Sequence, residues 1–442
     1  MVKRTVAFLT ALVLLFCFAG CKEEETSAPA PSIPTPPSSV SPPSSDPSSS
    51  EPSKKPSSSE PSSETDSSLP EAGEPPVSVH QPHYAFAKLS DLQKEYYEKL
   101  YEAVAKMQSS WIVLGVAEEN YKADIAVVRN ALMSDHPEIF WLPNFYASAI
   151  GTSVDERVAM IYFSTAPDAA PSYTVGRGDM EKKNRELERA VNKLISNVTA
   201  TDPYEIELLL HDKLCANTEY SNDSSDPMVY TAYGALVNGK ANCEGYTRAM
   251  QLLLGKFNIL SVPVSGVAKN EGHMWNAVYL EDEWYHLDAT WNDTVTGFVS
   301  HEYFHVTDGD IADDHTFGKN FAELSPSIFE DSLPSFNLVR PLCSGTANNF
   351  FARSGLIIGS DELDLFADLI AMSPDTSFEV ALGDTALRDQ LTADPKAFVT
   401  SLNSRLLERN PDAVFLVESI TLSRKVMRIY KYSPPPSADV KI

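Results

Sequence analysis

The 442-residue chain is short of basic residues. It has 35 lysines and arginines against 61 aspartates and glutamates, which gives a formal net charge of −26. A protein that binds nucleic acid without sequence preference needs a basic face to displace counterions, so this composition argues against such binding. It also argues against a polybasic patch that would hold the chain to an anionic membrane surface. We expect no nucleic-acid partner, and any membrane attachment must have another origin.

Long apolar runs and cysteines are also scarce. After the run Val6–Phe18, no stretch approaches the ~20 apolar residues that a membrane-spanning helix needs. The five cysteines stand at positions 17, 21, 215, 243 and 343. Three of them follow the N-terminal region, an odd number for an oxidising compartment. Cys215 and Cys343 either pair or are buried separately, and in both cases Cys243 remains a free thiol.

The N-terminus has the pattern of an export signal. Met1–Arg4 is basic, Val6–Phe18 is an apolar run of signal-peptide length, and Ala19-Gly20-Cys21 follows. An apolar run closed by Ala-Gly-Cys resembles a bacterial lipoprotein signal, although Phe18 stands where an aliphatic residue is usual. An ordinary secretory peptide cleaved nearby is the alternative. We expect residues 1–21 to be the signal, Cys21 to be lipidated, and the protein to be anchored at the outer face of the bacterial membrane.

Changes of composition along the chain predict its domains. Residues 22–82 are rich in Ser, Pro and Glu with almost no apolar content, so we expect a disordered stalk. Residues 83–200 predict a helix-rich region with a few strands. Residues 201–318 contain the candidate catalytic core. Residues 340–442 alternate short strands and helices, which predicts a small α+β domain, and no motif in it points to chemistry.

The starts of several helices are visible in the sequence. Ser90 followed by Gln93 makes a capping box ahead of helically spaced apolar residues. Asp202-Pro203 supplies an N-cap and a proline at the first helical position. In the C-terminal domain, helical runs are expected to begin at Asp384 and Asp394.

Residues 237–293 contain a cysteine, a histidine and an aspartate, the three residue types that thiol-based acyl transfer requires. A buried helical stripe follows Cys243, made of Tyr246, Met250, Leu253, Leu254 and Phe257. Cys243 is therefore expected in the first turn of a helix, where unpaired backbone amides and the helix dipole favour an anion. Such a position, together with a protonated histidine nearby, is typical of a reactive thiolate. The alternative is a small buried hydrophobic residue, the commonest fate of a free cysteine.

The sequence after this helix predicts a β-hairpin. His273–Leu280 alternates as a strand, Glu281-Asp282 forms a two-residue turn, and Glu283–Asp288 returns. A turn of that length pairs Leu280 with Glu283, and this pair sets the register of the hairpin. A loop that differed by one residue would put the opposite set of side chains on each face.

In this register His273 lies opposite Thr290, and Asp288 lies opposite Trp275. His273 and Asp288 then share one face of the sheet as diagonal neighbours about 7–8 Å apart, within reach of a hydrogen bond. This geometry suits a histidine base that is oriented by a carboxylate and paired with a nucleophile. We expect Cys243 to be that nucleophile.

Three motifs in this stretch resemble the transglutaminase-like superfamily. They are G-x-x-x-C-E-G-Y, G-H-x-W-N and W-Y-H-L-D-x-T-W, in the order of the family. The resemblance covers roughly residues 201–318 and places the family's catalytic residues on Cys243, His273 and Asp288. It implies an α+β fold with a papain-like core, in which the Cys-bearing helix packs on an antiparallel sheet. It also implies acyl transfer through a thioester: protein cross-linking, deamidation or peptide hydrolysis.

The resemblance leaves part of the site unassigned. The oxyanion of such a reaction would meet the backbone amide of Cys243 and one further donor, for which Tyr233 is a candidate. Ala289 stands where the family often has proline. The mechanism requires no cofactor and no metal. Its substrate would be a protein or a peptide, and cell-wall peptides are included because the protein is expected to be exported.

Other readings of the sequence remain open. His301-Glu302-Tyr303-Phe304-His305 matches the H-E-x-x-H pattern of zinc peptidases, which needs a helix to put both histidines on one face, but the surrounding residues favour a strand. The aspartates between residues 308 and 314 are better explained by a solvated loop or a helix cap than by a calcium site. His286 is expected to make a structural hydrogen bond. The protein could also belong to a different functional class: a non-catalytic surface or wall-binding module in which the triad is vestigial.

Overall fold

The computed structural model describes the greater part of the chain: residues 83–143, 145–154, 156–166, 169–294, 297–317 and 340–433. The expected signal sequence 1–21, its lipidation site Cys21 and the expected stalk 22–82 lie outside the described residues. Within them, no helix combines the length and the apolar composition that crossing a bilayer requires.

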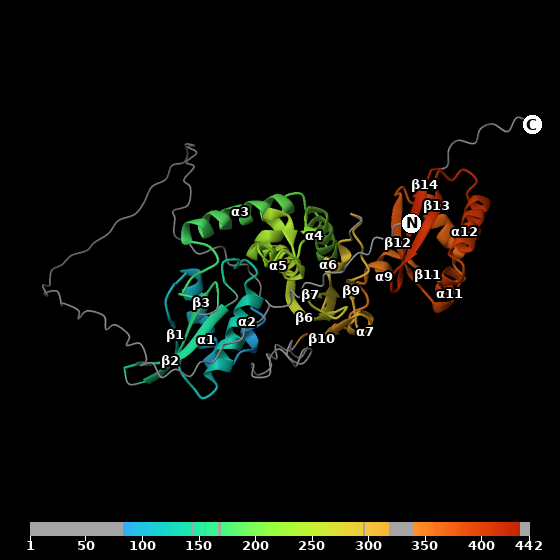
Figure 1. The fold of residues 1–442 in the computed structure, drawn as a ribbon. Coiled ribbons are helices and arrows are strands. Elements are labelled where there is room, and N and C mark those ends of the chain that lie inside the picture. Colours follow the sequence, from blue (N-terminus) through green and yellow to red (C-terminus); the bar gives the residue numbers. More distant parts are fainter. Residues whose placement is uncertain are drawn as a thin grey trace, which may run out of the picture.

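The N-terminal group of elements combines helices with one small sheet (Figure 1). Its elements are η1 (Phe86–Lys88), α1 (Asp91–Ala105), β1 (Ile112–Val116), α2 (Tyr121–Asp135), β2 (Phe145–Ser153), β3 (Glu156–Ser164) and α3 (Arg177–Ile195). The three strands are antiparallel in the order β1-β3-β2. The capping box before α1 is confirmed, because Ser90 Oγ accepts from the Gln93 amide and the Gln93 side chain accepts from the Ser90 amide.

The central group carries the cysteine-bearing helix and a larger sheet. Its first elements are α4 (Pro203–Asn217), β4 (Glu219–Tyr220), η2 (Pro227–Tyr230), η3 (Gly234–Asn238), β5 (Lys240–Ala241) and α5 (Cys243–Gly255). They are followed by β6 (Leu260–Ala268), β7 (Glu271–Leu280), β8 (Glu283–Leu287), α6 (Ala289–Asn292), β9 (Phe304–Val306), α7 (Asp308–Ile311) and β10 (His315–Phe317). The five-stranded sheet has the order β10-β6-β7-β8-β9, and every neighbouring pair is antiparallel.

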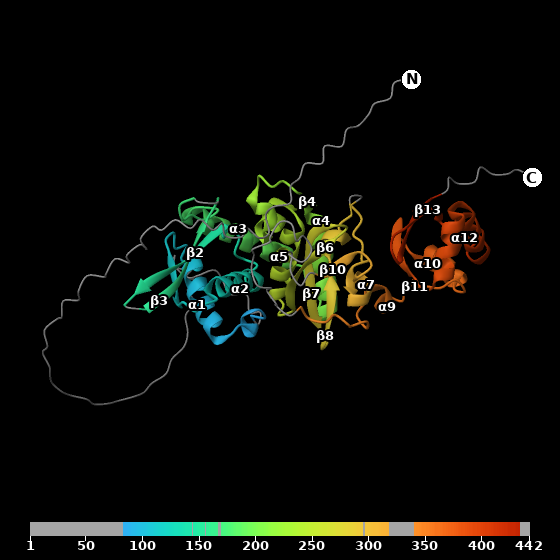
Figure 2. The same ribbon diagram turned by 60° about the horizontal axis from the view of Figure 1, so that its bottom comes forward.

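Helix α5 packs against β6 and β7 of this sheet. Its residues from Gly245 to Gly255 are all buried, and the predicted stripe residues Tyr246, Met250, Leu253 and Leu254 are fully covered. The predicted fold class is therefore confirmed: an α+β core in which the helix that begins at the cysteine lies on an antiparallel sheet. Figures 1 and 2 show this core between the N-terminal and C-terminal groups.

The predicted hairpin register is confirmed up to the end of β8. Leu280 pairs with Glu283, and Asn276 pairs with Leu287. The expected pair of His273 with Thr290 is wrong, because the chain leaves the sheet after Leu287 and turns into α6. Asp288 is the N-cap of that helix and accepts a hydrogen bond from the Trp291 amide. This cap diverts the strand before Thr290 can reach β7.

The C-terminal group has a sheet and a hydrophobic core of its own (Figure 2). Its elements are α9 (Phe350–Ser354), β11 (Ile357–Ile358), α10 (Leu363–Met372), β12 (Ser377–Leu382), α11 (Thr385–Ala393), α12 (Pro395–Arg409), β13 (Leu416–Leu422) and β14 (Val426–Tyr432). The strand order is β11-β12-β14-β13. The predicted helix starts are confirmed, because Asp384 and Asp394 cap α11 and α12.

Two glycines in the first turns of helices give opposite expectations for the same substitution. A Cβ at Gly245 of α5 would lie 2.4 Å from the Val229 carbonyl oxygen and 2.7 Å from the Ala241 Cβ, whereas a Cβ at Gly178 of α3 would meet nothing within 4 Å. We expect Gly245→Ala to lower the free energy of unfolding by about 2–3 kcal/mol through overpacking. Gly178→Ala should raise it by about 0.5–1 kcal/mol, because alanine is the better helix former. Urea denaturation followed by circular dichroism measures both free energies of unfolding. Equal changes in the two variants would contradict the close packing around Gly245 in α5.

Candidate active site

Cys243 is the first residue of α5, as the sequence predicts. Asn242 caps the helix, with its Oδ1 accepting a hydrogen bond from the Gly245 amide at 3.2 Å. The Asn242 amide itself donates to the Val229 carbonyl oxygen at 2.9 Å. The chain is therefore held on both sides of the point where the helix begins, and the Cys243 sulfur has a defined position at the helix N-terminus.

The three cysteines of the described residues are all free thiols, so Cys215 and Cys343 do not pair. Both are buried, whereas Cys243 is partly exposed. Burial raises the pKa of Cys343 to about 12 and raises the pKa of Cys215 well above its ordinary value. Of the three, Cys243 is the thiol that a reagent or substrate can reach.

His273 lies between Asp288 and Cys243. Its Nε2 is 2.7 Å from Asp288 Oδ2, and the Cys243 side chain is near enough to help raise the pKa of His273. Because Nε2 is used by the carboxylate, Nδ1 is the nitrogen left for the sulfur. The structure thus brings together the three residues that the sequence singled out, in the order thiol, imidazole, carboxylate.

His273 and Asp288 each shift the pKa of the other toward its charged form. Burial alone would lower the pKa of His273, but the Asp288 carboxylate and the Cys243 side chain outweigh it and raise that pKa to about 10. Burial alone would raise the pKa of Asp288, but hydrogen bonds and charge interactions with His273 and His315 hold it below its usual range. At neutral pH the cluster therefore contains a protonated imidazole beside an ionised carboxylate.

His315 is a member of the cluster that sequence reasoning missed. Its Nε2 lies 3.1 Å from Asp288 Oδ2, the oxygen that also binds His273. It reaches the site because β10 pairs with β6 along the edge of the sheet, with His315 opposite Ala268. No motif surrounds His315 in the sequence, so only the strand order could have indicated it.

The expected oxyanion donor Tyr233 is wrong. Its hydroxyl donates to Glu186 Oε2 at 2.7 Å, away from the cysteine. Tyr220 is closer to the site, because β4 pairs with β5 immediately before α5 and sets Tyr220 opposite Ala241. Although the residue is 45% exposed, burial around its hydroxyl and the charge of Cys243 raise the pKa of Tyr220 to about 12, so it keeps its proton.

Comparison with known proteins identifies the central group of elements. Residues 192–289 match the model of the transglutaminase-like superfamily. This part of the chain is similar to a transglutaminase-like core, and we refer to it by that term. The match contains Cys243, His273 and Asp288 and ends before His315. This superfamily includes cysteine peptidases and acyltransferases.

Two curated proteins are similar to part of the chain. The kyphoscoliosis peptidase of Mus musculus is 26% identical over 166 residues, which are 32% of this chain and 25% of that protein. The kyphoscoliosis peptidase of Homo sapiens is 28% identical over 137 residues, which are 26% of this chain and 21% of that protein. The chain therefore spans about a quarter or less of the length of these relatives.

Solved structures show a partial likeness. A crystal structure of a TGase has a TM-score of 0.24 and 10% identity, covering 34% of this chain and 44% of that one. A proposed cysteine protease from Cytophaga hutchinsonii has a TM-score of 0.22 and 14% identity, covering 35% of this chain and 65% of that one.

The H-E-x-x-H pattern at residues 301–305 does not form a zinc-peptidase site. His301 precedes the strand β9 and His305 lies within it, so no helix puts them on one face. His301 Nε2 lies 2.9 Å from Asp212 Oδ1, and His305 Nε2 lies 2.9 Å from Glu207 Oε1. The two histidines thus have separate carboxylate partners.

Three clusters in the described residues have ligand-type atoms within 4.8 Å of one another: His211 with Asp212 and His301, His273 with Asp288 and His315, and His286 with Asp308 and Cys343. In each cluster hydrogen bonds already join imidazole nitrogens to the carboxylate. These bonds account for the clusters without a metal ion. The expected structural role of His286 is confirmed, because its Nε2 lies 2.9 Å from Asp308 and its Nδ1 accepts from Trp275 Nε1 at 3.0 Å.

The aspartates after β9 serve as helix caps and ion-pair partners. Asp308 and Asp310 lie in the first turn of α7, and Asp310 forms a capping box with Thr307. The helix-cap explanation of this acidic stretch is therefore confirmed.

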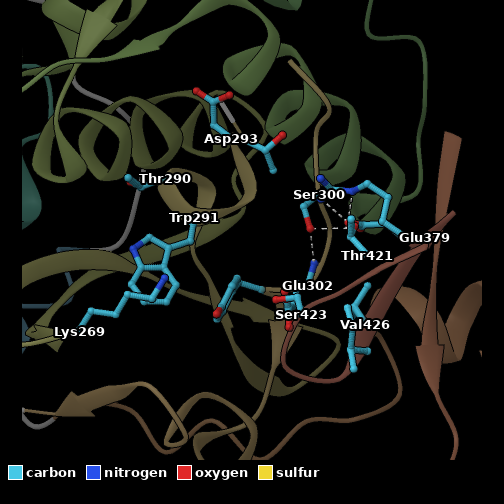
Figure 3. Close-up of a pocket in the computed structure, with 14 residues that line it drawn as sticks. Lys269, Thr290, Trp291, Asp293, Ser300, Glu302, Glu379, Thr421, Ser423 and Val426 are labelled. Carbon is cyan, nitrogen blue, oxygen red and sulfur yellow. Dashed lines mark hydrogen bonds and ion pairs between the residues drawn. The ribbon is translucent and has the colours of Figure 1, made fainter. Parts of the chain in front are cut away.

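A pocket of about 390 Å³ lies beside Trp291 (Figure 3). Trp291 forms one wall, and its ring centroid lies 5.6 Å from that of His273, while the Lys269 ammonium lies 4.1 Å from the Trp291 centroid. Facing residues come from the C-terminal group, among them Glu379 and Ser423. The space beside the transglutaminase-like core is thus partly enclosed by the C-terminal sheet.

The charge state of His273 gives the site a pH signature. Its pKa in the folded protein, about 10, exceeds the ordinary 6.5, so the stability that this proton provides is complete below about pH 6.5 and is lost as the pH rises toward 10. In Asp288→Asn the carboxylate that raises this pKa is gone. We expect the difference in unfolding free energy between wild type and Asp288→Asn to shrink steadily from pH 7 to pH 10.

Urea titrations at several pH values measure this difference. Subtracting the variant removes the contributions of tyrosines and of other groups common to both proteins. A difference that stays constant over the whole pH range would show that His273 does not hold its proton through Asp288.

Proposed function

We propose that this protein is a thiol enzyme that transfers acyl groups from protein or peptide amides through a thioester on Cys243. The observation that carries the proposal is a partly exposed Cys243 beside His273, which is hydrogen-bonded to Asp288, within the residues that match the transglutaminase-like family model. A buried structural cysteine would need neither an exposed sulfur nor a protonated imidazole beside it. Cys243 has both.

The geometry supports the following reaction. The Cys243 thiolate attacks the carbonyl carbon of a substrate amide, and the negative oxygen of the tetrahedral intermediate meets the Cys243 amide at the helix N-terminus. Tyr220 is our candidate for the second donor. The C–N bond then breaks, and the imidazolium of His273 gives its proton to the leaving amine.

The second half of the reaction reverses the roles. His273, now neutral, takes a proton from the acceptor as the acceptor attacks the thioester, and the acyl group leaves the sulfur. Water as acceptor gives hydrolysis or deamidation, and an amine gives cross-linking. Asp288 keeps the imidazole ring oriented in both halves and stabilises its charged form.

We propose that this chemistry takes place outside the cell. The export pattern of residues 1–21, with lipid on Cys21, would anchor the protein to the outer face of the membrane, and residues 22–82 would separate the core from that membrane. Proteins and peptides at that surface, including cell-wall peptides, are then the substrates within reach.

The thiol mechanism predicts the effect of removing each cysteine. Cys243→Ala should reduce acyl transfer by about 10⁴-fold or more, because the nucleophile itself is lost. Cys343→Ala is the matched control: its thiol is buried and has a raised pKa, so activity should remain within a few-fold of wild type. The assay incubates the protein with glutamine-containing proteins and cell-wall peptides and follows products by mass spectrometry. Activity retained in Cys243→Ala would exclude the thioester.

The same assay separates the possible acceptors. Cross-linking with release of ammonia lowers the summed mass by about 17 Da, deamidation raises it by about 1 Da, and hydrolysis divides the peptide. Iodoacetamide at neutral pH followed by peptide mapping gives a substrate-free check. Cys243 should be modified in the folded protein, and Cys215 and Cys343 should not.

The proposed location can be tested at the N-terminus. Cys21→Ser should move the protein from the membrane fraction to the soluble fraction of its host, because the lipid anchor has no attachment site. The wild-type N-terminal peptide should carry a diacylglycerol mass on Cys21. Cys21→Ser that stays with the membrane would contradict lipid anchoring.

A further inference from the structure

His315 is held between two carboxylates. Its Nδ1 lies 2.7 Å from Asp314 Oδ1, and its Nε2 lies 3.1 Å from Asp288 Oδ2. The side chain of His315 is fully buried. Each ring nitrogen of His315 is therefore held by a carboxylate oxygen, and one of these oxygens, Asp288 Oδ2, is the oxygen that orients His273.

Asp314, the other partner of His315, is held by a residue from the C-terminal group. The Tyr303 hydroxyl donates to Asp314 Oδ2 at 2.7 Å. Arg424 Nη1 lies 3.8 Å from Asp314 Oδ1, and the Arg424 guanidinium covers the Tyr303 ring at 4.8 Å. The Arg424 guanidinium therefore lies beside the partly exposed Asp314 carboxylate and restricts its position.

Arg424 reaches the core through the turn between β13 and β14. Its Nη1 donates to the Asp310 carbonyl oxygen, and its Nε lies 3.7 Å from Glu302 Oε1. The neighbouring Lys425 Nζ lies 2.8 Å from Asp310 Oδ1. Only 12% of the Arg424 side chain is exposed. The two basic side chains of this turn therefore contact Asp310, Glu302 and Asp314 of the central group.

A second contact holds the C-terminal sheet in the same place. Glu379 Oε2 of β12 accepts from Ser300 Oγ and from the His301 amide, both at 3.1 Å, and Glu379 Oε1 accepts from Arg428 Nη2 at 2.6 Å. Figure 3 shows Glu379 and Ser300 joined across the pocket, with Glu302 near Ser423. One strand and one turn of the C-terminal group are thus fastened to the segment between Ser300 and Asp314.

We infer that the C-terminal domain completes the catalytic site, with Arg424 and His315 as positioning residues that act through Asp314 and Asp288. The contacts run without a gap from Arg424 to Asp314, His315, Asp288 and His273. The inference rests on the proposed function and adds to it. It gives a role to a domain in which the sequence shows no chemical motif.

The physical effect is on orientation. Asp288 Oδ2 is shared by His273 and His315, so a change in the position of His315 changes the direction in which the carboxylate holds His273. Without Arg424, Asp314 loses one of the contacts that fix its position, so it holds the His315 ring in a less defined place. Neither Arg424 nor His315 lines the pocket beside Trp291. Their loss should therefore lower kcat and leave KM nearly unchanged.

The test compares Arg424→Gln with Arg405→Gln in the full chain. Arg405 is the matched control, because it also forms an ion pair, with Asp364, but within the C-terminal domain. We expect Arg424→Gln to lower kcat about tenfold, the size of a coupling between contacting charged residues, with KM within twofold of wild type. Arg424→Lys should recover part of the loss, and Arg405→Gln should match wild type. Circular dichroism and urea midpoints verify that each variant is folded.

Two further experiments test whether Arg424 acts through His315 and whether its effect reaches Cys243. His315→Gln should lower kcat at least as much as Arg424→Gln, and the double variant should be no slower than His315→Gln alone. The alkylation rate of Cys243 by iodoacetamide should fall in Arg424→Gln and stay at the wild-type value in Arg405→Gln. This arm needs no substrate.

The outcomes separate the inference from the proposed function. Equal kcat values and equal alkylation rates in Arg424→Gln and Arg405→Gln would overturn the inference. A double variant of Arg424→Gln and His315→Gln whose kcat is lowered by the product of the two single effects would also overturn it. An alkylation rate that depends on Arg424, in a protein without acyl-transfer activity, would support the inference and overturn the proposed function.

Discussion

The buried Asp288 carboxylate is the interaction on which the rest of the site depends. It has no exposure to solvent, and it accepts hydrogen bonds from His273, His315 and the Trp291 amide. An isolated carboxylate at this depth would cost several kcal/mol to bury, so it is tolerated only with such partners. The carboxylate in turn raises the pKa of His273 and fixes its ring beside Cys243.

Several local features of the chain follow from this one charge. The strand β8 has to end at Leu287 so that Asp288 can cap α6, and α6 in turn places Trp291 beside His273. The strand β10 has to add to β6 so that His315 reaches the carboxylate from the other side. The sheet edge, the short helix and the cap are therefore parts of one arrangement around a buried anion.

The C-terminal domain extends this arrangement beyond the transglutaminase-like core. Its turn at Arg424 and its strand residue Glu379 contact the segment that follows Asp288. That segment carries the H-E-x-x-H pattern, whose histidines bind Asp212 and Glu207 separately. What resembles a metal site in the sequence is, in the folded chain, part of the surface on which the C-terminal domain rests.

Local sequence signals predicted the parts of the site that depend on local geometry. The caps at Ser90, Asp384 and Asp394, the start of α5 at Cys243 and the pairing of Leu280 with Glu283 all depend on hydrogen bonds or spacings within a few residues. The two-residue turn was enough to put His273 within reach of Asp288. The predicted partner Thr290 was wrong, because a helix cap competes with strand extension and periodicity does not reveal which one wins.

The sequence by itself singled out Cys243, His273 and Asp288 as candidates for nucleophile, base and orienting carboxylate, because each belongs to a short motif whose spacing specifies its geometry. Only the tertiary structure decided that His315 and Arg424 join them, that Tyr233 does not, and that Cys215 and Cys343 are separately buried. The physical reason is distance along the chain. Arg424 lies more than a hundred residues from Asp314, and no local propensity carries information about which strand edge or loop it will meet once the domains pack.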